Sequence, residues 1–176
     1  VGGATRMGKT TFLNAMLSSL LRYRPGELNV AFVDPKGVEF NVWSGIPHQI
    51  APIAETAEAA LPVLHALVGE MQARRARFKA ARVKSLSQYN AVAPQPLPLI
   101  VVVLDEVTDL TEEDHRLYSP LTRLASKGAA FGIVLVVATQ NPNFEVVPTV
   151  IRSNLSTRLG FRVANLQGYT ASLDGE

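Results

Sequence analysis

Residues 3–10 read GATRMGKT, and this stretch matches the phosphate-loop pattern G-x-x-x-x-G-K-[ST]. In such a loop, successive backbone N–H groups surround phosphate oxygens, and the following helix adds the positive end of its dipole. The next residues carry apolar side chains at helical spacing, which predicts a helix over residues 9–22. Because the mechanism requires a helix directly after the loop, the stretch predicts a nucleotide site.

The loop residues have different expected roles at this site. We expect Lys9 to reach the β- and γ-phosphates of ATP, and the Thr10 hydroxyl to bind Mg²⁺. The predicted nucleotide contacts are Gly3, Ala4, Thr5, Arg6, Met7, Gly8, Lys9, Thr10 and Thr11.

Outward from the loop, strand-like and helix-like segments alternate. The predicted strands are residues 29–34, 99–104, 132–139 and 157–163. The further predicted helices are residues 55–83, interrupted or kinked near Pro62, then 112–127 and 147–154, and residues 90–98 are a predicted loop. This alternation predicts an α/β fold with a mostly parallel sheet flanked by helices, in one domain over residues 1–176.

Two acids, Asp105 and Glu106, end the apolar run LIVVVL. A carboxylate at the end of a buried parallel strand lies beside the phosphate loop, so Asp105 is expected to hold the magnesium shell. A neighbouring acid can orient and polarise the attacking water, which predicts Glu106, with Lys9, as a catalytic residue of ATP hydrolysis. The alternative is an ordinary strand end in solvent, and the phosphate loop argues against it.

Two further strand ends carry polar residues whose roles stay open. Gln140 can contact the γ-phosphate and report its loss, or it is a turn residue before Asn141 and a proline. Asp34 and Lys36 lie at the sheet edge where open parallel sheets bind ligands, and a plain turn explains them equally well.

The composition excludes several kinds of site. The chain has 47% hydrophobic and 18% charged residues, which is typical of a globular domain, and it has no cysteine for disulfide or thiolate chemistry. Its apolar runs are far shorter than the roughly 18 residues that cross a bilayer. We therefore expect a cytoplasmic domain, at the inner face of the cell membrane if a longer protein carries an anchor.

A basic stretch between residues 74 and 84 contains no acid. It can bind a nucleic-acid backbone or an acidic neighbouring subunit, and a solvated helix face is the simpler interpretation. Its cations are Arg74, Arg75, Arg77, Lys79, Arg82 and Lys84.

Several segments, in this order, resemble the FtsK/SpoIIIE family of DNA-translocating ATPases. They are GATRMGKT, DPKGVEF, GIPH, EMQARR, VVVLDEVTDL, LASKG, GIVLVVATQNP and IRSNLSTRLGFRV. The phosphate loop and the acid pair occur in many ATPases, whereas the DPKG and GIPH block and the final segment are more specific. The similarity runs from Gly3 to about Asp174, which is nearly the whole chain.

The resemblance implies a RecA-like P-loop NTPase fold of the ASCE type. It implies an ATP-dependent translocase of double-stranded DNA that assembles as a hexameric ring and serves chromosome partition or conjugative transfer. ATP sites in such rings lie between subunits, and Arg158 or Arg162 of one subunit would stabilise transition-state charge in the next. The resemblance also implies that a core strand precedes Val1 and a closing segment follows Glu176. The related type VII secretion ATPases, which act on polypeptides, are the alternative.

Three residues depart from the family pattern. Ala129 and Asn141 stand where family members often carry arginine, and Arg6 stands where many chromosomal members carry glycine. The change at Ala129 puts an intersubunit or DNA role of that position in doubt. The GATR form of the loop looks more like versions from plasmids and conjugative elements.

Overall fold

A parallel three-stranded sheet forms the centre of the protein. The computed structural model describes residues 1–4, 7–140, 149–155 and 157–162. The strands are β1 (Leu28–Val33), β2 (Leu99–Leu104) and β3 (Ile133–Val137), in the order β1-β2-β3. All neighbouring pairs are parallel, which confirms the predicted sheet. The apolar run at residues 99–104 coincides with β2.

The strands are buried on both faces. In β1, Ala31 and Val33 belong to one apolar cluster, whereas Val30 and Phe32 belong to a second cluster on the opposite face. Successive side chains of a strand point to opposite faces, so a strand that is covered on both sides needs an apolar residue at nearly every position. This requirement explains the uninterrupted apolar runs in the sequence.

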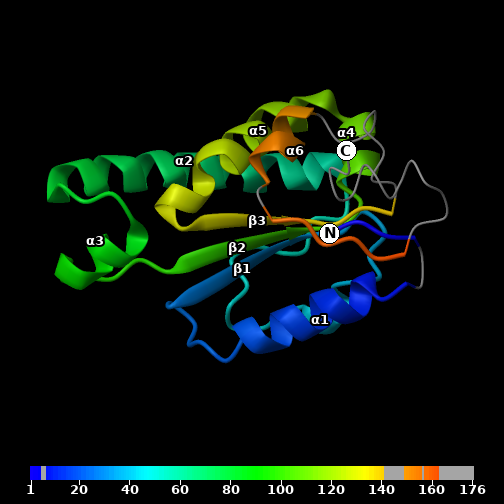
Figure 1. The fold of residues 1–176 in the computed structure, drawn as a ribbon, viewed down its shortest axis with the longest axis horizontal. Coiled ribbons are helices and arrows are strands. Elements are labelled where there is room, and N and C mark those ends of the chain that lie inside the picture. The colour runs from blue at the N-terminus through cyan, green and yellow to red at the C-terminus, as the bar shows by residue number, and fades with distance from the viewer. Residues whose placement is uncertain (5–6, 141–148, 156, 163–176) are drawn as a thin grey trace.

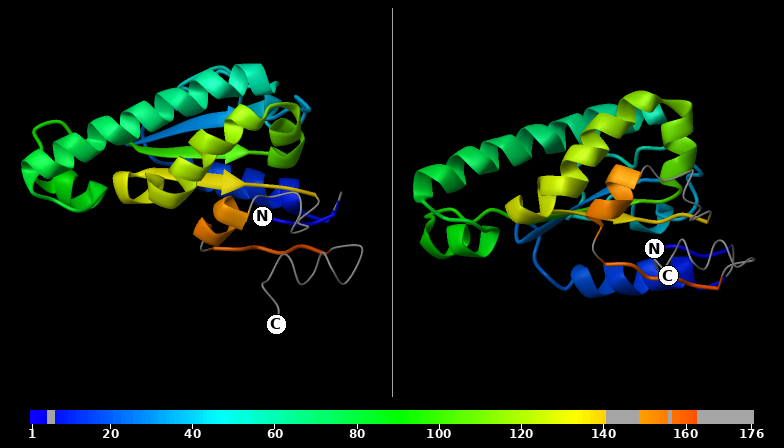
Figure 2. Two further views of the ribbon diagram at one scale, coloured as in Figure 1. Left: turned by 90° about the horizontal axis from the view of Figure 1, so that it is seen from above. Right: turned by 45° about the horizontal axis from the view of Figure 1, so that its top comes forward.

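Helices cover both faces of the sheet (Figures 1 and 2). On one face lies α1 (Lys9–Leu20). On the other face lie α2 (Ala57–Ala81), α4 (Val107–Glu113) and α5 (Tyr118–Lys127), and α6 (Thr149–Asn154) packs beside α5. The remaining elements are α3 (Leu86–Val92) and the 3₁₀ turns η1 (Asn41–Trp43), η2 (His115–Leu117) and η3 (Gly128–Phe131).

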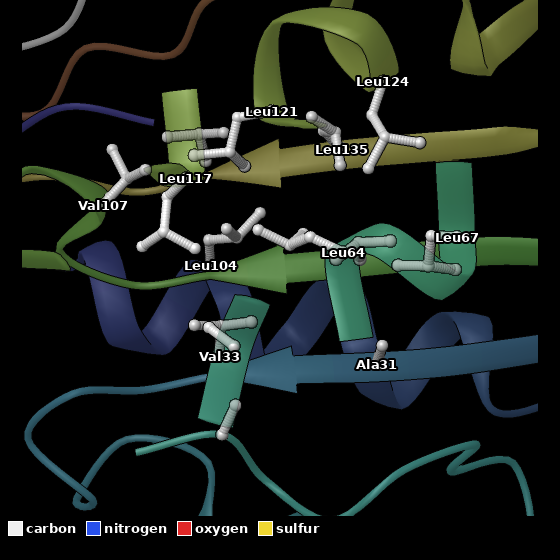
Figure 3. Close-up of a cluster of buried hydrophobic side chains, with 14 of the residues drawn as sticks. Ala31, Val33, Leu64, Leu67, Leu104, Val107, Leu117, Leu121, Leu124 and Leu135 are labelled. Carbon is white, nitrogen blue, oxygen red and sulfur yellow. The ribbon is translucent and has the colours of Figure 1, made fainter. Parts of the chain in front are cut away.

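The larger apolar cluster lies between the sheet and α2, α4 and α5. Figure 3 shows Leu64 of α2 and Leu121 of α5 directed toward Leu104 of β2. All three side chains are about 1% exposed. Burial of a leucine side chain contributes roughly 1.5–3 kcal/mol, so this cluster holds the helices on the face of the sheet.

The sheet order extends past β3 through isolated pairings. Gly2 forms parallel bridges with both Thr139 and Gly160, so residues 1–4 lie between the end of β3 and residues 157–162. The Gly2 N–H donates to the Leu159 carbonyl at 2.8 Å, and the Phe161 N–H donates to the Gly2 carbonyl at 2.7 Å. Within the described residues 157–162, the predicted strand is thus present as one bridge, at Gly160, with backbone hydrogen bonds to residues 2–4.

The predicted helices agree with the structure in part. The helix predicted over 55–83 is confirmed as α2, and it is not interrupted at Pro62, because α2 continues through that residue. Pro62 lies near the helix start and removes one intrahelical hydrogen bond. The single helix predicted over 112–127 is wrong, because Asp114 is extended (φ −144°, ψ 105°) and caps η2. The loop predicted over 90–98 begins only after Val92, because α3 occupies residues 86–92. Its N-cap is Ser85, whose hydroxyl accepts a hydrogen bond from the Gln88 N–H.

Candidate functional site

The phosphate loop meets the ends of β1, β2 and β3 at one edge of the sheet. Gly8 caps α1 with φ +100°, a left-handed conformation that strongly favours glycine. A pocket of about 130 Å³ opens here, lined by Ala4, Gly8, Lys9, Thr10, Thr11, Glu39 and Gln140. The structure thus brings most of the predicted loop contacts to one pocket.

The other predicted loop residues lie outside this lining. Gly3 is buried, and a Cβ there would lie 2.6 Å from the Phe161 Cβ, so a glycine is required for this close approach. Met7 is an exposed side chain. Thr5 and Arg6 lie outside the described residues.

Lys9 bridges the two acids at the end of β2. Its Nζ lies 2.9 Å from Glu106 Oε1 and 3.1 Å from Asp105 Oδ1. All three side chains are at least nine-tenths buried, so these charges interact with little screening by water. The predicted catalytic and metal-binding residues are therefore neighbours in space although 97 positions separate Lys9 from Glu106.

Glu106 adopts a backbone conformation that is rare for its residue type. Its φ and ψ are 45° and 51°, in the left-handed region, at the start of α4. Such a conformation costs on the order of 1–3 kcal/mol and persists where surrounding contacts enforce it. The carboxylate makes these contacts by accepting hydrogen bonds from Lys9 Nζ and from the Gln140 backbone N–H at 3.0 and 3.2 Å. The strained turn thus directs Glu106 to the pocket edge.

Burial and charge oppose each other at this site. Burial raises the pKa of Asp105, the Lys9 ammonium opposes that rise, and the negative charges of Glu106 and Glu39 add to it. Burial alone would lower the pKa of Lys9, but the hydrogen bond to Glu106 and the charges of both neighbouring acids raise it above its usual value. Lys9 is therefore held in its charged form, which is the form that binds phosphate.

The residues present suit a hydrated magnesium ion. Asp105 Oδ1 is ion-paired with Lys9 Nζ at 3.1 Å, and beyond this pair neither buried carboxylate oxygen of Asp105 has a hydrogen-bond partner in the described part of the chain. The Thr10 hydroxyl is on the first turn of α1, beside the same pocket. Residues 1–4, 7–140, 149–155 and 157–162 contain no cluster of three metal-binding side chains. Magnesium is commonly held by one or two protein groups, water and the substrate phosphates, so this donor set fits it.

Gln140 and the two candidate arginines have different positions relative to the pocket. Gln140 lines the pocket and its backbone holds Glu106. Arg162 accepts a hydrogen bond through its carbonyl from the Ala4 N–H at 3.0 Å, and its side chain is exposed. Arg158 is half-buried in the same segment. The segment 157–162 therefore lies against the start of the phosphate loop.

Asp34 proves to be a structural residue. Its fully buried carboxylate accepts hydrogen bonds from the backbone N–H groups of Lys36, Gly37, Glu39 and Phe40, at 2.8–3.2 Å. These contacts fold residues 34–40 into a tight turn, which favours the turn interpretation of this strand end. The Lys36 side chain is exposed and lies 3.9 Å from Asp109.

Glu39 is a pocket residue that the sequence interpretation missed. It lies five positions beyond the buried carboxylate that ends β1, and no spacing rule connects it to the phosphate loop. Only the turn organised by Asp34 brings it to the pocket. The one sequence feature that could have indicated this role is the position of Glu39 within the DPKGVEF segment.

The basic stretch divides into buried and exposed parts. Arg74 is 1% exposed and donates to Glu70 Oε1 at 2.7 Å and to the Phe131 and Gly132 carbonyls. It therefore serves packing between α2 and η3. A separate groove of about 410 Å³ is lined by the exposed cations Arg75, Lys79, Arg123 and Lys127 together with Met71, Gln72, Ala76 and Phe131.

Two remaining sequence features can be placed only in part. Ala129 is an exposed residue of η3, and Asn141 lies outside the described residues. In the part of the chain that the structure describes, no helix is both long enough and apolar enough to cross a membrane.

Comparison with known sequences identifies the family. The sequence model of the FtsK/SpoIIIE family matches residues 1–144. The DNA translocase FtsK of Helicobacter pylori strain 26695 is 37% identical over 169 residues, which cover 93% of this chain and 20% of that protein. The DNA translocase SpoIIIE of Bacillus subtilis strain 168 is 36% identical over 186 residues, covering 99% of this chain and 24% of that protein. The chain thus spans a quarter or less of the length of these relatives.

Solved structures show the same fold. The pCW3 conjugation coupling protein TcpA, in a monomer form with ATPγS, matches with a TM-score of 0.87 and 26% identity, covering 99% of this chain and 51% of that one. The cytoplasmic domain of the Thermomonospora curvata type VII secretion ATPase EccC matches with a TM-score of 0.83 and 28% identity, covering 98% and 21%. The predicted P-loop ATPase fold is confirmed, and the chain belongs to the FtsK/SpoIIIE family.

Proposed function

We propose that this chain is the ATP-hydrolysing motor domain of a double-stranded DNA translocase. The observation that carries the hydrolase assignment is the buried group of Lys9, Asp105 and Glu106 at the edge of the phosphate-loop pocket. The names of the relatives, DNA translocases FtsK and SpoIIIE, support DNA as the cargo. On this proposal residues 1–176 form one RecA-like domain that works in the cytoplasm.

Each residue of the pocket has a task in this reaction. The backbone N–H groups of the loop and the Lys9 ammonium bind the β- and γ-phosphates, and Thr10 and Asp105 hold Mg²⁺. The metal, when bound, neutralises charge on the transferred phosphoryl group. Glu106 accepts a hydrogen bond from the attacking water and so orients it. Gln140 contacts the γ-phosphate. The strained backbone of Glu106 keeps its carboxylate in place for this task.

We further propose that the domain acts in a hexameric ring around DNA. ATP would then lie between subunits, and Arg158 or Arg162 would reach the phosphates bound by the neighbouring subunit. The support in this chain is the position of residues 157–162, which are hydrogen-bonded along residues 2–4.

Protein transport is the competing function. The likeness to the type VII secretion ATPase EccC, with 28% identity and a TM-score of 0.83, favours it. Higher identity to the DNA translocases over 93–99% of this chain favours DNA.

The deciding experiment measures ATP hydrolysis by the full-length protein with and without linear duplex DNA. We expect duplex DNA to raise the rate severalfold, and a secretion-signal peptide to leave it unchanged. Glu106→Gln should lower turnover by about 10²-fold or more while keeping ATP binding, since it removes a transition-state interaction. An ATPase rate that responds to the peptide and ignores DNA would overturn the DNA assignment. Equal turnover in Glu106→Gln and the unaltered protein would overturn the role of Glu106.

A further inference from the structure

Glu39 is the one acid that lines the phosphate-loop pocket in the described part of the chain. It shares this lining with Lys9, Thr10 and Gln140. Lys9, which lines the pocket with it, lies 3.1 Å from Asp105 Oδ1, and the Glu39 charge adds to the rise that burial causes in the pKa of Asp105. The proposed function assigns no task to Glu39.

The fold fixes the backbone on both sides of Glu39. Its own N–H donates to Asp34 Oδ2 at 2.8 Å, and the next N–H, of Phe40, donates to the same oxygen at 3.1 Å. Phe40 is 1% exposed and packs against Phe32 with ring centroids 5.2 Å apart. The position of Glu39 at the pocket is thus built into the structure and does not depend on a flexible loop end.

The Glu39 side chain has no structural partner that would explain this placement. In the described residues its carboxylate makes no hydrogen bond or ion pair. The oxygens of a structural carboxylate normally accept hydrogen bonds from the protein. Those of Asp34 accept four, all from backbone N–H groups. Glu39 is instead a half-buried acid directed to the pocket with its oxygens available to a ligand.

The positive charge of Lys9 at this pocket is already compensated by acids when no nucleotide is bound. In the described residues the pocket lining holds one cation, Lys9, and one acid, Glu39, and the Lys9 ammonium is already paired with Asp105 and Glu106. Polyphosphate that arrives without a counterion therefore meets like charge. Nucleotide that carries a divalent cation does not, because the cation lies between the phosphates and the acids. Magnesium also retains several water molecules, which need acceptors for their hydrogen atoms.

We propose that Glu39 is a positioning and specificity-determining residue for the magnesium-loaded nucleotide. Its carboxylate accepts hydrogen bonds from water that the metal retains, and its charge repels nucleotide that lacks the metal. This inference rests on the proposed nucleotide site, and it adds the selection of Mg²⁺-nucleotide over free nucleotide.

The test compares nucleotide affinity with and without metal in the full-length protein. A fluorescent, slowly hydrolysed ATP analogue is titrated by anisotropy, once in excess Mg²⁺ and once in EDTA, against unaltered protein and Glu39→Gln. Glutamine keeps the size of the side chain and removes its charge. We expect Glu39→Gln to bind the analogue about threefold to tenfold more tightly in EDTA, as removal of one nearby like charge implies. The ratio of the affinity in Mg²⁺ to the affinity in EDTA should be smaller in Glu39→Gln than in the unaltered protein, by at least the same factor.

Glu55→Gln is the matched control. Glu55 is an exposed acid near Gly37 in the same part of the fold, and it does not line the pocket. It should leave both affinities unchanged. Circular dichroism and thermal unfolding check that each variant is folded.

The outcomes separate this inference from the proposed function. An Mg²⁺ effect in Glu39→Gln equal to that of the unaltered protein overturns the inference and leaves ATP hydrolysis untouched. Equal weakening in Mg²⁺ and EDTA assigns Glu39 a purely structural role and also overturns it. Failure of the unaltered protein to bind the analogue at all overturns both proposals. As a second readout, the Mg²⁺ concentration that half-saturates ATPase activity should rise in Glu39→Gln by more than kcat falls.

Discussion

Replacement of Asp34 by asparagine tests whether one buried carboxylate organises the segment between β1 and the pocket. Asp34 accepts four backbone N–H groups with its two oxygens. Asparagine has one carbonyl oxygen, which can keep two of these donors, while its NH₂ group faces the other two. Hydrogen bonds to a charged group contribute roughly 1.5–3 kcal/mol each, and buried donors without partners add a penalty. We therefore expect Asp34→Asn to lower the free energy of unfolding by about 3–5 kcal/mol.

The measurement is urea unfolding at equilibrium, followed by circular dichroism and by the fluorescence of Trp43. This is the only tryptophan of the chain, and its indole N–H donates to Asn14 Oδ1 at 2.8 Å, so it reports on the segment after the Asp34 turn. The matched control is Asp109→Asn, whose exposed carboxylate lies 3.9 Å from Lys36 Nζ. An exposed pair of this kind contributes less than about 1 kcal/mol. A loss in Asp34→Asn no larger than in this control would refute the reasoning.

Two further predictions concern the arginines. Arg74→Ala should lower the free energy of unfolding by about 3 kcal/mol in urea, because it leaves buried carbonyls and a carboxylate without their donor. The neighbouring exposed Arg75→Ala should stay within about 0.5 kcal/mol, and equal effects would contradict the buried role. If Arg158 or Arg162 acts in a neighbouring subunit, its alanine variant and Glu106→Gln should each be inactive alone. Mixed in equal amounts they should recover up to about a quarter of normal ATPase activity, since a quarter of the subunit interfaces are then intact. No recovery in the mixture would place the arginine in its own subunit's site.

Much of the candidate site could be predicted because its signals are local or follow from the geometry of a parallel sheet. The phosphate loop is one short segment, and its N–H groups work only in front of a helix, so the pattern and the helix together identify it. Asp105 and Glu106 end an apolar run, and parallel strands end at one edge of the sheet. That these acids lie close to Lys9 can therefore be predicted without knowing how the side chains pack.

Other roles could not be predicted because they depend on contacts between distant segments. Asp34 and Glu39 both lie in DPKGVEF. The sequence does not show which carboxylate lines the pocket and which accepts hydrogen bonds from the backbone. Arg74 and Arg75 are chemically identical neighbours in a basic stretch, yet one is buried and the other exposed. The helix rotates by about 100° between them, so the position of η3 decides which arginine is enclosed.

The sequence by itself determined the nucleotide-binding loop, the acid pair, the parallel α/β class and the family. These features are encoded in contiguous residues, whose spacing and apolar pattern follow directly from backbone geometry. The tertiary structure alone decided that Lys9 bridges Asp105 and Glu106, that Asp34 is structural and that Glu39 lines the pocket. Such assignments depend on burial and on donors supplied by other segments, which exist only once the chain has packed.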